Sequence, residues 1–231
     1  MRTRLERSAI GMMSFVIFGA GGHAKSVFDS LEPSLRAAFR GFVSNASASE
    51  KSMFGYPVMS EAQTLETVAR NEVRKGFVAI GDNEGRRRLV EKISALNSKF
   101  EFLSVISPLA RVSSDAVVGK GVFVGAFASI GPFSVLEDFS ILNTGANLEH
   151  DAVVESFASI SPGAQLAGQS HIGFQAAVGM NASVLEGVRV GPQALIGAGS
   201  VIAKEVSNFQ VVFGPKAELR RVRRQGDSYL K

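Results

Sequence analysis

A six-residue period of aliphatic and small residues runs through the second half of the chain. From Val105 the sequence divides into seventeen consecutive hexads that end at Val206. The second position of every hexad is Ile, Leu or Val, and the sixth is Ala, Ser or Val. Three short strands joined by turns make one triangular coil, so one aliphatic side chain per hexad points inward and stacks on the next coil. The period predicts a left-handed parallel β-helix of nearly six coils over residues 105–206.

The other hexad positions predict what happens at the corners of this solenoid. The small sixth residue is expected at a corner where a larger side chain would not fit. Glycine recurs at the third position of seven hexads, where we expect it to relieve tight turns. The phenylalanines of the repeat mostly avoid the inward position, so we expect them on outer faces, in contacts between subunits: Phe123, Phe127, Phe133, Phe139, Phe157 and Phe174.

The N-terminal part alternates apolar strands with amphipathic helices. We expect strands at residues 15–18, 40–43 and 76–80 and around 102–106, a loop up to Gly55, and helices at 25–31, 60–71 and 84–96. This alternation indicates a small Rossmann-like α/β domain with a parallel sheet. The expected organisation is an extension at 1–13, the α/β domain at 14–104, the β-helix at 105–206 and a tail at 207–231.

Composition limits the chemistry that this chain can perform. Its 231 residues include 24 Gly but no Cys, which excludes disulfides, thiolate zinc sites and a cysteine nucleophile and is compatible with a cytoplasmic location. No apolar run reaches the roughly 18 residues of a membrane span, and no secretory leader follows the basic start. We expect residues 1–12 to be an upstream extension, with Met12 or Met13 as an alternative start.

The net charge of +4 comes largely from the chain ends. The tail carries Arg220, Arg221, Arg223, Arg224 and Lys231. No aromatic platform accompanies these residues, so a solvated end is favoured over a nucleic-acid or phosphate patch.

A glycine turn, GAGGHA from Gly19 to Ala24, follows the first expected strand and opens a helix. Bare backbone N–H groups at a helix N-terminus are suited to a phosphate. The dinucleotide fingerprint also needs an acidic residue about twenty positions on, but Ser44 and Asn45 stand there, which disfavours NAD. A mononucleotide, a nucleotide-sugar or a purely structural turn stay open. A second polar turn, Gly81–Asn83, is expected at the same edge of the sheet.

The chain has three histidines that could act as a general base. His23 follows the glycine turn and could contact a phosphate, whereas His171 occupies an ordinary outward strand position and is expected to be structural. His150 projects outward between two carboxylates, Glu149 and Asp151. A carboxylate on one imidazole nitrogen fixes the tautomer and raises the basicity of the other. The alternative is a surface histidine in a turn.

Several motifs together carry a resemblance to a known family over residues 14–217. They are VIFGAGGHAKSV, VAIGDNEGRRRL, LNTGANLEHDAVV, LAGQSHIG and LIGAGSVIAKEV. With these motifs the chain resembles the bacterial sugar O- and N-acetyltransferases related to the sialic acid O-acetyltransferase and the UDP-4-amino-sugar N-acetyltransferase of bacillosamine synthesis.

The resemblance implies a homotrimer in which the N-terminal domain holds a nucleotide-linked amino sugar and acetyl-CoA lies in the groove between two β-helices. It implies His150 as the base, Asp151 as its orienting residue and Asn143 nearby. The implied nucleotide-sugar site comprises Gly21, Gly22, His23, Ser44, Asn45, Gly81, Asp82 and Asn83. The positions implied to approach acetyl-CoA are Ser159, Gly168, Met180 and Ala198.

The chain departs from the family pattern at four places. Many relatives have a second histidine where Ser159 stands, an aspartate where Ser44 and Asn45 stand, and a histidine at Ser107. The closing G-x-P-A motif is one residue short at Gly214 to Ala217.

We therefore expect a cytoplasmic, acetyl-CoA-dependent N-acetyltransferase that acts on a nucleotide-linked 4-amino sugar for O-antigen or other surface glycan biosynthesis. The alternatives are a sugar O-acetyltransferase of the sialic acid type and a non-catalytic solenoid. A carbonic-anhydrase-like metal site needs three histidines, and only His150 and His171 lie in the repeat. No metal, nucleic-acid partner or membrane insertion is expected.

Overall fold

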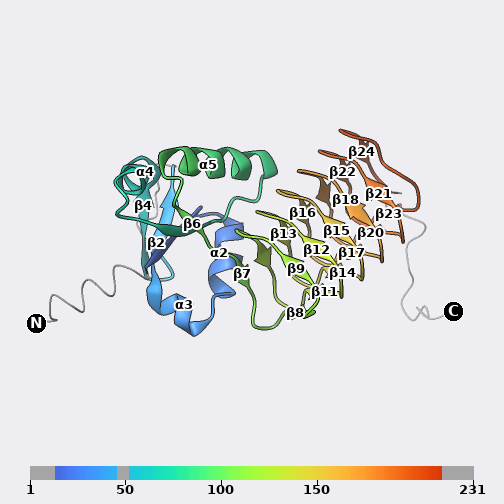
Figure 1. Ribbon diagram of the computed structural model, residues 1–231, viewed down its shortest axis with the longest axis horizontal. Coiled ribbons are helices and arrows are strands. Elements are labelled where there is room, and N and C mark those ends of the chain that lie inside the picture. Colours follow the sequence, from blue (N-terminus) through green and yellow to red (C-terminus); the bar gives the residue numbers. More distant parts are fainter. Residues whose placement is uncertain (1–13, 46–51, 215–231) are drawn as a thin grey trace, which may run out of the picture.

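The fold of the chain is an α/β domain followed by a long three-sided solenoid (Figure 1). This computed structural model describes residues 14–45 and 52–214. The expected extension at 1–13 and the basic tail from 215 onward, including its four arginines, lie outside the described residues. Within the described ranges, no helix is long and apolar enough to cross a membrane.

The N-terminal domain contains a six-stranded sheet in the order β3-β4-β2-β1-β5-β6. Its strands are β1 (Phe15–Phe18), β2 (Phe39–Ser44), β3 (Ser52–Met53), β4 (Tyr56–Ser60), β5 (Lys75–Val78) and β6 (Glu101–Phe102). All neighbours are parallel except β3 and β4, which form an antiparallel edge hairpin. The Rossmann-like sheet is confirmed, but the segment up to Gly55, expected to be a loop, contains β3, and β4 was not predicted.

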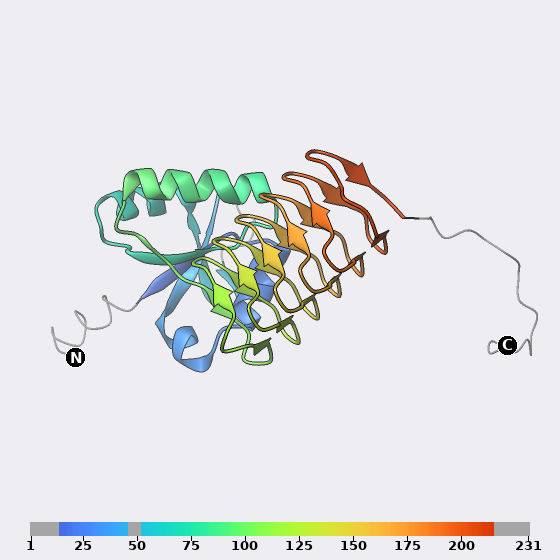
Figure 2. The same cartoon turned by 45° about the vertical axis from the view of Figure 1, so that its right-hand side comes forward.

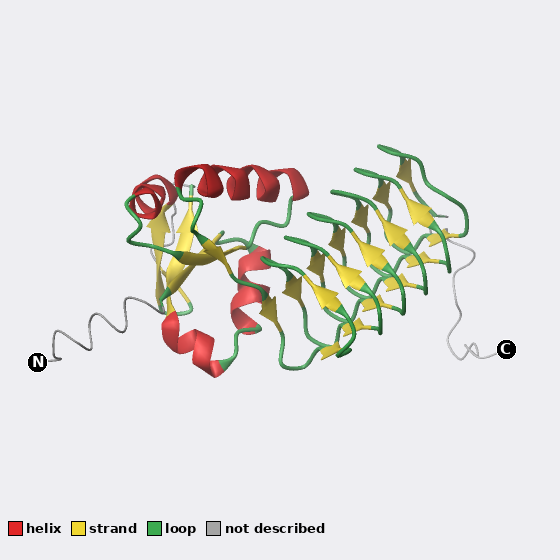
Figure 3. Cartoon of the chain, viewed as in Figure 1, coloured by secondary structure: helices red, strands yellow, loops and turns green. Residues whose placement is uncertain are grey.

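Helices cover both faces of this sheet (Figure 3). They are α2 (Gly22–Asp29), α3 (Pro33–Ala38), α4 (Glu61–Ala69) and α5 (Asn83–Leu96). Helix α2 packs on the face that carries Phe15 and Ile17, whereas α4 and α5 pack on the face that carries Val16 and Phe18. Helix α2 begins at Gly22, earlier than expected, so the glycine turn itself forms the helix N-terminus. Helix α3 was not predicted.

The predicted β-helix is confirmed as three parallel sheets that form the faces of a prism (Figure 2). Face 1 consists of β7 (Val105–Ile106), β10 (Phe123–Val124), β13 (Ile141–Leu142), β16 (Ser159–Ile160), β19 (Ala177–Val178), β22 (Leu195–Ile196) and β24 (Val211–Val212). Face 2 consists of β8 (Arg111–Val112), β11 (Ser129–Ile130), β14 (Asn147–Leu148), β17 (Gln165–Leu166), β20 (Ser183–Val184) and β23 (Val201–Ile202). Face 3 consists of β9 (Val117–Val118), β12 (Val135–Leu136), β15 (Val153–Val154), β18 (His171–Ile172) and β21 (Arg189–Val190).

The solenoid core consists of the inward aliphatic row and the small sixth residues. From Val124 to Ile196 the second position of each hexad is almost fully buried, and Ala146, at a sixth position, is equally inaccessible. Ile106 and Val112 are each 37% exposed because they belong to the first coil, which has no coil stacked before it. The predicted inward stacking is therefore confirmed, and it is incomplete only at this end.

Glycine at the third position serves a different purpose from the one expected. Gly125 has an ordinary φ, but a Cβ on it would lie 2.6 Å from the backbone nitrogen of Thr144 in the next coil. Close stacking of coils therefore requires these glycines. The left-handed φ angles fall instead at the fifth position, where Phe127 (59°), Asp151 (58°) and Gly145 (65°) are examples. The turn strain is thus carried two residues later than predicted.

The solenoid continues past its expected end at Val206. The backbone of Val206 bridges to Val190 on face 3, and β24 pairs in parallel with β22. Val206 follows the inward Ile202 by four positions rather than six, so a two-residue deletion interrupts the hexad count but not the stacking of the coils.

Face 1 of the solenoid packs directly against the α/β domain. Val105, Phe123 and Ile141 belong to the same buried cluster as helix α2. Phe139 is also buried and stacks on Phe157. The expectation that the repeat phenylalanines lie on outer faces is wrong for Phe123 and Phe139, which join the two domains. It is correct for Phe127 and Phe133, which are 69% and 68% exposed.

Candidate functional site

A pocket of about 700 Å³ lies over the carboxyl ends of β1, β2 and β5. Six of the residues predicted to bind a nucleotide-sugar line it together: Gly21, Gly22, His23, Ser44, Asn45 and Gly81. Ligands of open parallel sheets bind at this edge, where the strand order reverses. The sequence motifs thus converge on one site.

The glycine turn keeps the floor of this pocket open. Gly19 has φ of 127°, and a Cβ on it would lie 2.5 Å from the carbonyl oxygen of Ala79 on the neighbouring strand. Gly21, Gly22 and Gly81 have no atom within 4 Å of where a Cβ would stand. Since α2 begins at Gly22, the N-terminus of this helix lies at the pocket, and a helix N-terminus suits an anionic group.

His23 lies at the inner wall of the pocket. Its ring packs edge-on against Phe123 with centroids 5.1 Å apart. Burial, and secondarily the charge of Arg86, lower the pKa of His23 to about 4. Its Nε2 is buried and has no partner among the described residues. The imidazole is therefore neutral at physiological pH and has one buried nitrogen without a hydrogen-bond partner among the described residues.

Three charged side chains that the sequence analysis missed also line the pocket. They are Glu61 at the start of α4, and Arg88 and Lys92 one turn apart on α5. Lys92 Nζ lies 3.3 Å from Glu61 Oε1, and Arg88 pairs with Glu84. The helical spacing of Arg88 and Lys92 could have suggested a shared face, but no sequence feature places that face at the pocket.

Asp82 and Asn83 do not line this pocket. The Asp82 carboxylate accepts a hydrogen bond of 2.6 Å from the backbone N–H of Gly85 and caps α5. Asn83 donates to the backbone carbonyls of Gln175 and Ala176, 92 and 93 residues away in the solenoid. The structure therefore places the second polar turn at the junction between the domains.

A buried arginine is the centre of that junction. Arg86 is 1% exposed, and its guanidinium donates to the carbonyls of Phe139 (2.8 Å), Phe157 (2.7 Å) and Ile80 (2.8 Å). Burial lowers the pKa of Arg86 to about 10, which still leaves it charged at neutral pH. Ser159, expected near acetyl-CoA, accepts from Arg86 and donates to Asn83 at 2.6 Å. It belongs to this polar network at the base of the solenoid.

His150 stands at the corner between faces 2 and 3. Its Nδ1 lies 2.9 Å from Asp151 Oδ2, and about half of each side chain is exposed. The hydrogen bond to Asp151 is the main cause of a raised pKa at His150, and the charges of Asp151, Glu186 and Glu149 act in the same direction. With Nδ1 held by the carboxylate, the other ring nitrogen, Nε2, can accept a proton.

Gly168 lies directly beneath the His150 ring, one coil further along. A Cβ on Gly168 would be 2.5 Å from His150 Cε1 and 2.6 Å from Nε2. The φ of Gly168 is not left-handed, so the turn itself does not demand glycine there. The imidazole ring is what requires the missing side chain, which places Gly168 in the immediate surroundings of His150.

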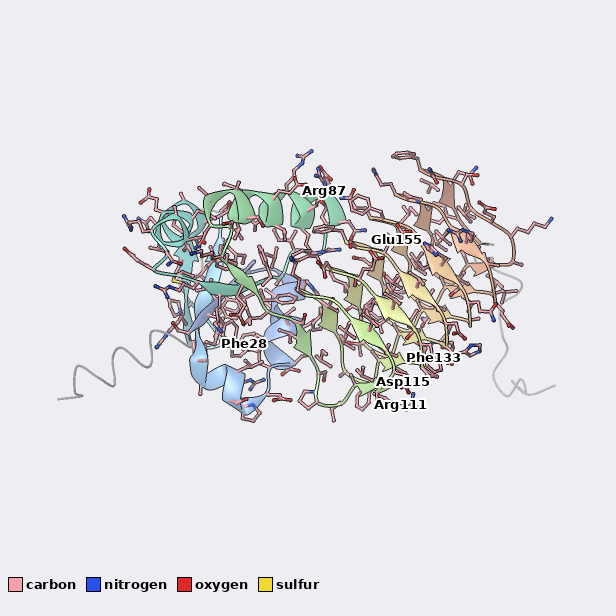
Figure 4. All side chains as sticks on the ribbon, in the orientation of Figure 1. Phe28, Arg87, Arg111, Asp115, Phe133 and Glu155 are labelled. Carbon is pink, nitrogen blue, oxygen red and sulfur yellow. The ribbon has the colours of Figure 1, made fainter. Side chains whose placement is uncertain are left out.

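The remaining predicted residues occupy another corner. Asn143, Met180 and Ala198 follow strands of face 1 and lie at the corner between faces 1 and 2. No hydrogen bond among the described residues joins Asn143 to His150. The corner that carries His150 is opposite face 1, which packs on the α/β domain. Figure 4 shows Phe133, from the preceding turn of that corner, on the side of the solenoid away from Arg87 and α5.

His171 forms a second histidine–carboxylate pair, but in a structural setting. Its Nε2 lies 2.6 Å from Glu155 Oε1, and the other carboxylate oxygen accepts the backbone N–H of Phe174. Glu137 accepts the N–H of Ser156 one coil earlier in the same way. Glu155 therefore joins neighbouring coils, as expected if His171 is structural. In the described ranges no group of three or more potential ligands could hold a metal ion.

Comparison with known proteins places these features in context. Residues 14–93 match the PglD N-terminal domain family. The chain is 32% identical to a histidine-to-alanine mutant of GDP-perosamine N-acetyltransferase from Caulobacter crescentus, solved with CoA and GDP-perosamine. That match covers 87% of this chain and 93% of the other, with a TM-score of 0.79.

Two further solved structures share the whole architecture. The acetyltransferase domain of PglB from Neisseria gonorrhoeae, in complex with acetyl coenzyme A, is 32% identical over 87% of this chain and 96% of its own, with a TM-score of 0.78. WeeI from Acinetobacter baumannii, at 22% identity, shares the fold over 87% of this chain and 97% of its own, with a TM-score of 0.77. No curated protein sequence matches the chain.

Proposed function

The chain belongs to the hexapeptide-repeat sugar acetyltransferase family, and from that premise we propose that it transfers an acetyl group from acetyl-CoA to the amine of a nucleotide-linked amino sugar, with His150 as general base. The observation that carries this proposal is the His150–Asp151 pair on an otherwise repetitive corner. The relative solved with CoA and GDP-perosamine supports both the donor and the class of acceptor.

The reaction needs one proton acceptor and one well-placed amine. Asp151 accepts the Nδ1 proton of His150, so Nε2 presents a lone pair to the sugar amine. As the amine nitrogen attacks the thioester carbonyl, Nε2 takes the amine proton, the new C–N bond forms and the C–S bond breaks. The proton on Nε2 is then available to the departing CoA thiolate. His150 thus acts first as a base and then as an acid.

The geometry of one chain supports a homotrimer as the active form. The nucleotide pocket lies on the side of face 1, whereas His150 stands at the opposite corner. In a ring with face 2 toward the axis, the corner with Met180 and Ala198 in one copy would lie beside the corner with His150 in the next. The residues predicted to contact acetyl-CoA would then meet in one groove between two copies.

We propose that Asn143 contributes from the same corner as Met180 and Ala198 and contacts the acceptor opposite His150. We further propose that the reaction takes place in the cytoplasm and serves O-antigen or other surface glycan synthesis. The nucleotide and the sugar are to be identified by substrate screening.

The test is a thiol-release assay with acetyl-CoA and a panel of acceptors. The chain contains no cysteine, so a thiol-reactive dye reports only released CoA. We expect turnover with one of the GDP-, UDP- or dTDP-linked 4-amino sugars and none with free sialic acid. Turnover with sialic acid alone would instead identify a sugar O-acetyltransferase.

The residue assignment is tested with His150→Ala and the matched control His171→Ala. We expect His150→Ala to lower kcat by at least about a hundredfold while the trimer stays intact in light scattering. His171→Ala should keep most of the activity, since that ring is tied to Glu155. Full activity of His150→Ala would refute the mechanism.

A further inference from the structure

The nucleotide pocket lacks the acidic residue that commonly holds a ribose at the end of the second strand. In Rossmann-type sites that carboxylate accepts hydrogen bonds from the ribose hydroxyls. Here Ser44 and Asn45 occupy the end of β2, and neither is ionisable. A nucleotide in this pocket would therefore have no carboxylate from β2.

The neighbouring strand β4 is followed by a carboxylate, Glu61, at the level where β2 ends. Strand β4 runs parallel to β2 with Ser60 opposite Ser44, so Glu61 follows at the level of Asn45. Neighbouring strands are about 4.8 Å apart, so the Glu61 backbone lies about one strand spacing from the usual position of the acid. The Glu61 side chain lines the pocket and is only 19% exposed.

The surroundings of Glu61 suit a carboxylate that binds hydroxyl groups. It lies in the first turn of α4, where the helix dipole favours negative charge. Lys92 Nζ is 3.3 Å from Oε1 and is itself half-exposed at the pocket. The strand order β4-β2-β1 separates Glu61 from the glycine turn by two strand spacings, about 10 Å.

We infer that Glu61 binds the ribose hydroxyls and makes this enzyme selective for ribonucleoside over 2′-deoxyribonucleoside diphosphate sugars. An ionised carboxylate only accepts hydrogen bonds, and its two oxygens can take both donors of a vicinal diol. A 2′-deoxyribose offers only one of these donors. This inference rests on the proposed nucleotide-sugar function and narrows its substrates to the GDP- and UDP-linked class.

The test is calorimetric binding of GDP, UDP and their 2′-deoxy counterparts to the full-length protein. For the wild type we expect the ribonucleotide to bind about tenfold or more tightly than its deoxy form. Glu61→Gln should weaken the ribonucleotide about tenfold and bring the ratio close to one. Glu66→Gln, at an exposed position of the same helix, is the matched control and should change neither affinity.

The outcomes separate this inference from the proposed function. If the wild type binds none of the four nucleotides, the proposed nucleotide site is wrong. If nucleotides bind but Glu61→Gln leaves the ribose-to-deoxyribose ratio unchanged, the inference about Glu61 is overturned. A loss that follows the base, equal for GDP and deoxy-GDP but absent for UDP, also overturns it and assigns Glu61 to the base.

Discussion

Replacing Gly168 with alanine tests how closely the position of the His150 ring, the proposed general base, is fixed. The new Cβ would lie 2.5 Å from His150 Cε1, whereas ordinary contacts begin near 3.4 Å, so the ring must move by about 1 Å. The backbone itself tolerates alanine at this fourth position of the hexad, as Ala126 and Ala198 demonstrate. Because half of the His150 side chain is exposed, the ring can swing away without disturbing the core.

The expected loss in kcat is about a hundredfold, since a misplacement of about 1 Å at a reacting group has that effect. This corresponds to about 2.7 kcal/mol in the activation barrier. Stability should stay the same or rise by up to about 1 kcal/mol, because alanine restricts the unfolded chain. The measurements are initial rates of thiol release at saturating substrates, together with thermal unfolding and light scattering.

Ala126→Gly is the matched control, because it exchanges the same two residues at the same repeat position. It lies on the corner between faces 1 and 2, one coil before Asn143, the first residue of that corner that we assign to the site. It should leave kcat unchanged. If Gly168→Ala keeps more than half of the wild-type kcat while His150→Ala is inactive, the activity of His150 does not depend on the space left by the missing side chain of Gly168. In that case the reasoning from the ring contact is refuted.

Three further changes probe the pair, the junction and the pocket. Asp151→Asn keeps a residue that tolerates left-handed φ but removes the carboxylate, and it should lower kcat about tenfold or more. Because a base must be neutral to act and Asp151 raises the pKa of His150 above 6.5, the variant should also move the acidic limb of the pH profile of kcat/KM to lower pH, to 6.5 or below. Arg86→Met leaves several buried carbonyls without donors and should lower unfolding stability by about 3 kcal/mol or more, unlike exposed Arg70→Met; denaturant titration of both variants decides this. Gly19→Ala should unfold the α/β domain at lower temperature, because its Cβ would overlap the Ala79 carbonyl; an unchanged melting curve would contradict this.

The repeat was readable from the sequence because one physical rule acts at every coil. An aliphatic residue must point inward every six residues, so a single period predicts the fold, the inward row and the outward direction of His150. The role of glycine at the third hexad position was predicted wrongly. The sequence displays where glycine recurs, but not whether a left-handed φ or the close approach of a neighbouring coil requires it.

Only half of the proposed nucleotide pocket could be predicted from the sequence. Its glycine turn has a recognisable local sequence signature. Glu61, in contrast, reaches the pocket because β4 pairs in parallel with β2, and the segment between these strands was expected to be a loop. Arg86 was missed because a charged residue on a polar helix face predicts exposure, and its burial depends on carbonyls contributed by the distant solenoid. Contacts of long sequence separation leave no periodic trace in one chain.

The left-handed fifth position of most hexads has an evolutionary consequence. Aspartate is among the residues that tolerate this conformation, so Asp151 satisfies the backbone and pairs with His150 through the same side chain. In the proposed mechanism, a catalytic coil differs from a spacer coil by a histidine at position four, an aspartate at position five and a glycine one coil later. New active sites can therefore arise in such repeats through very few substitutions, with the scaffold unchanged.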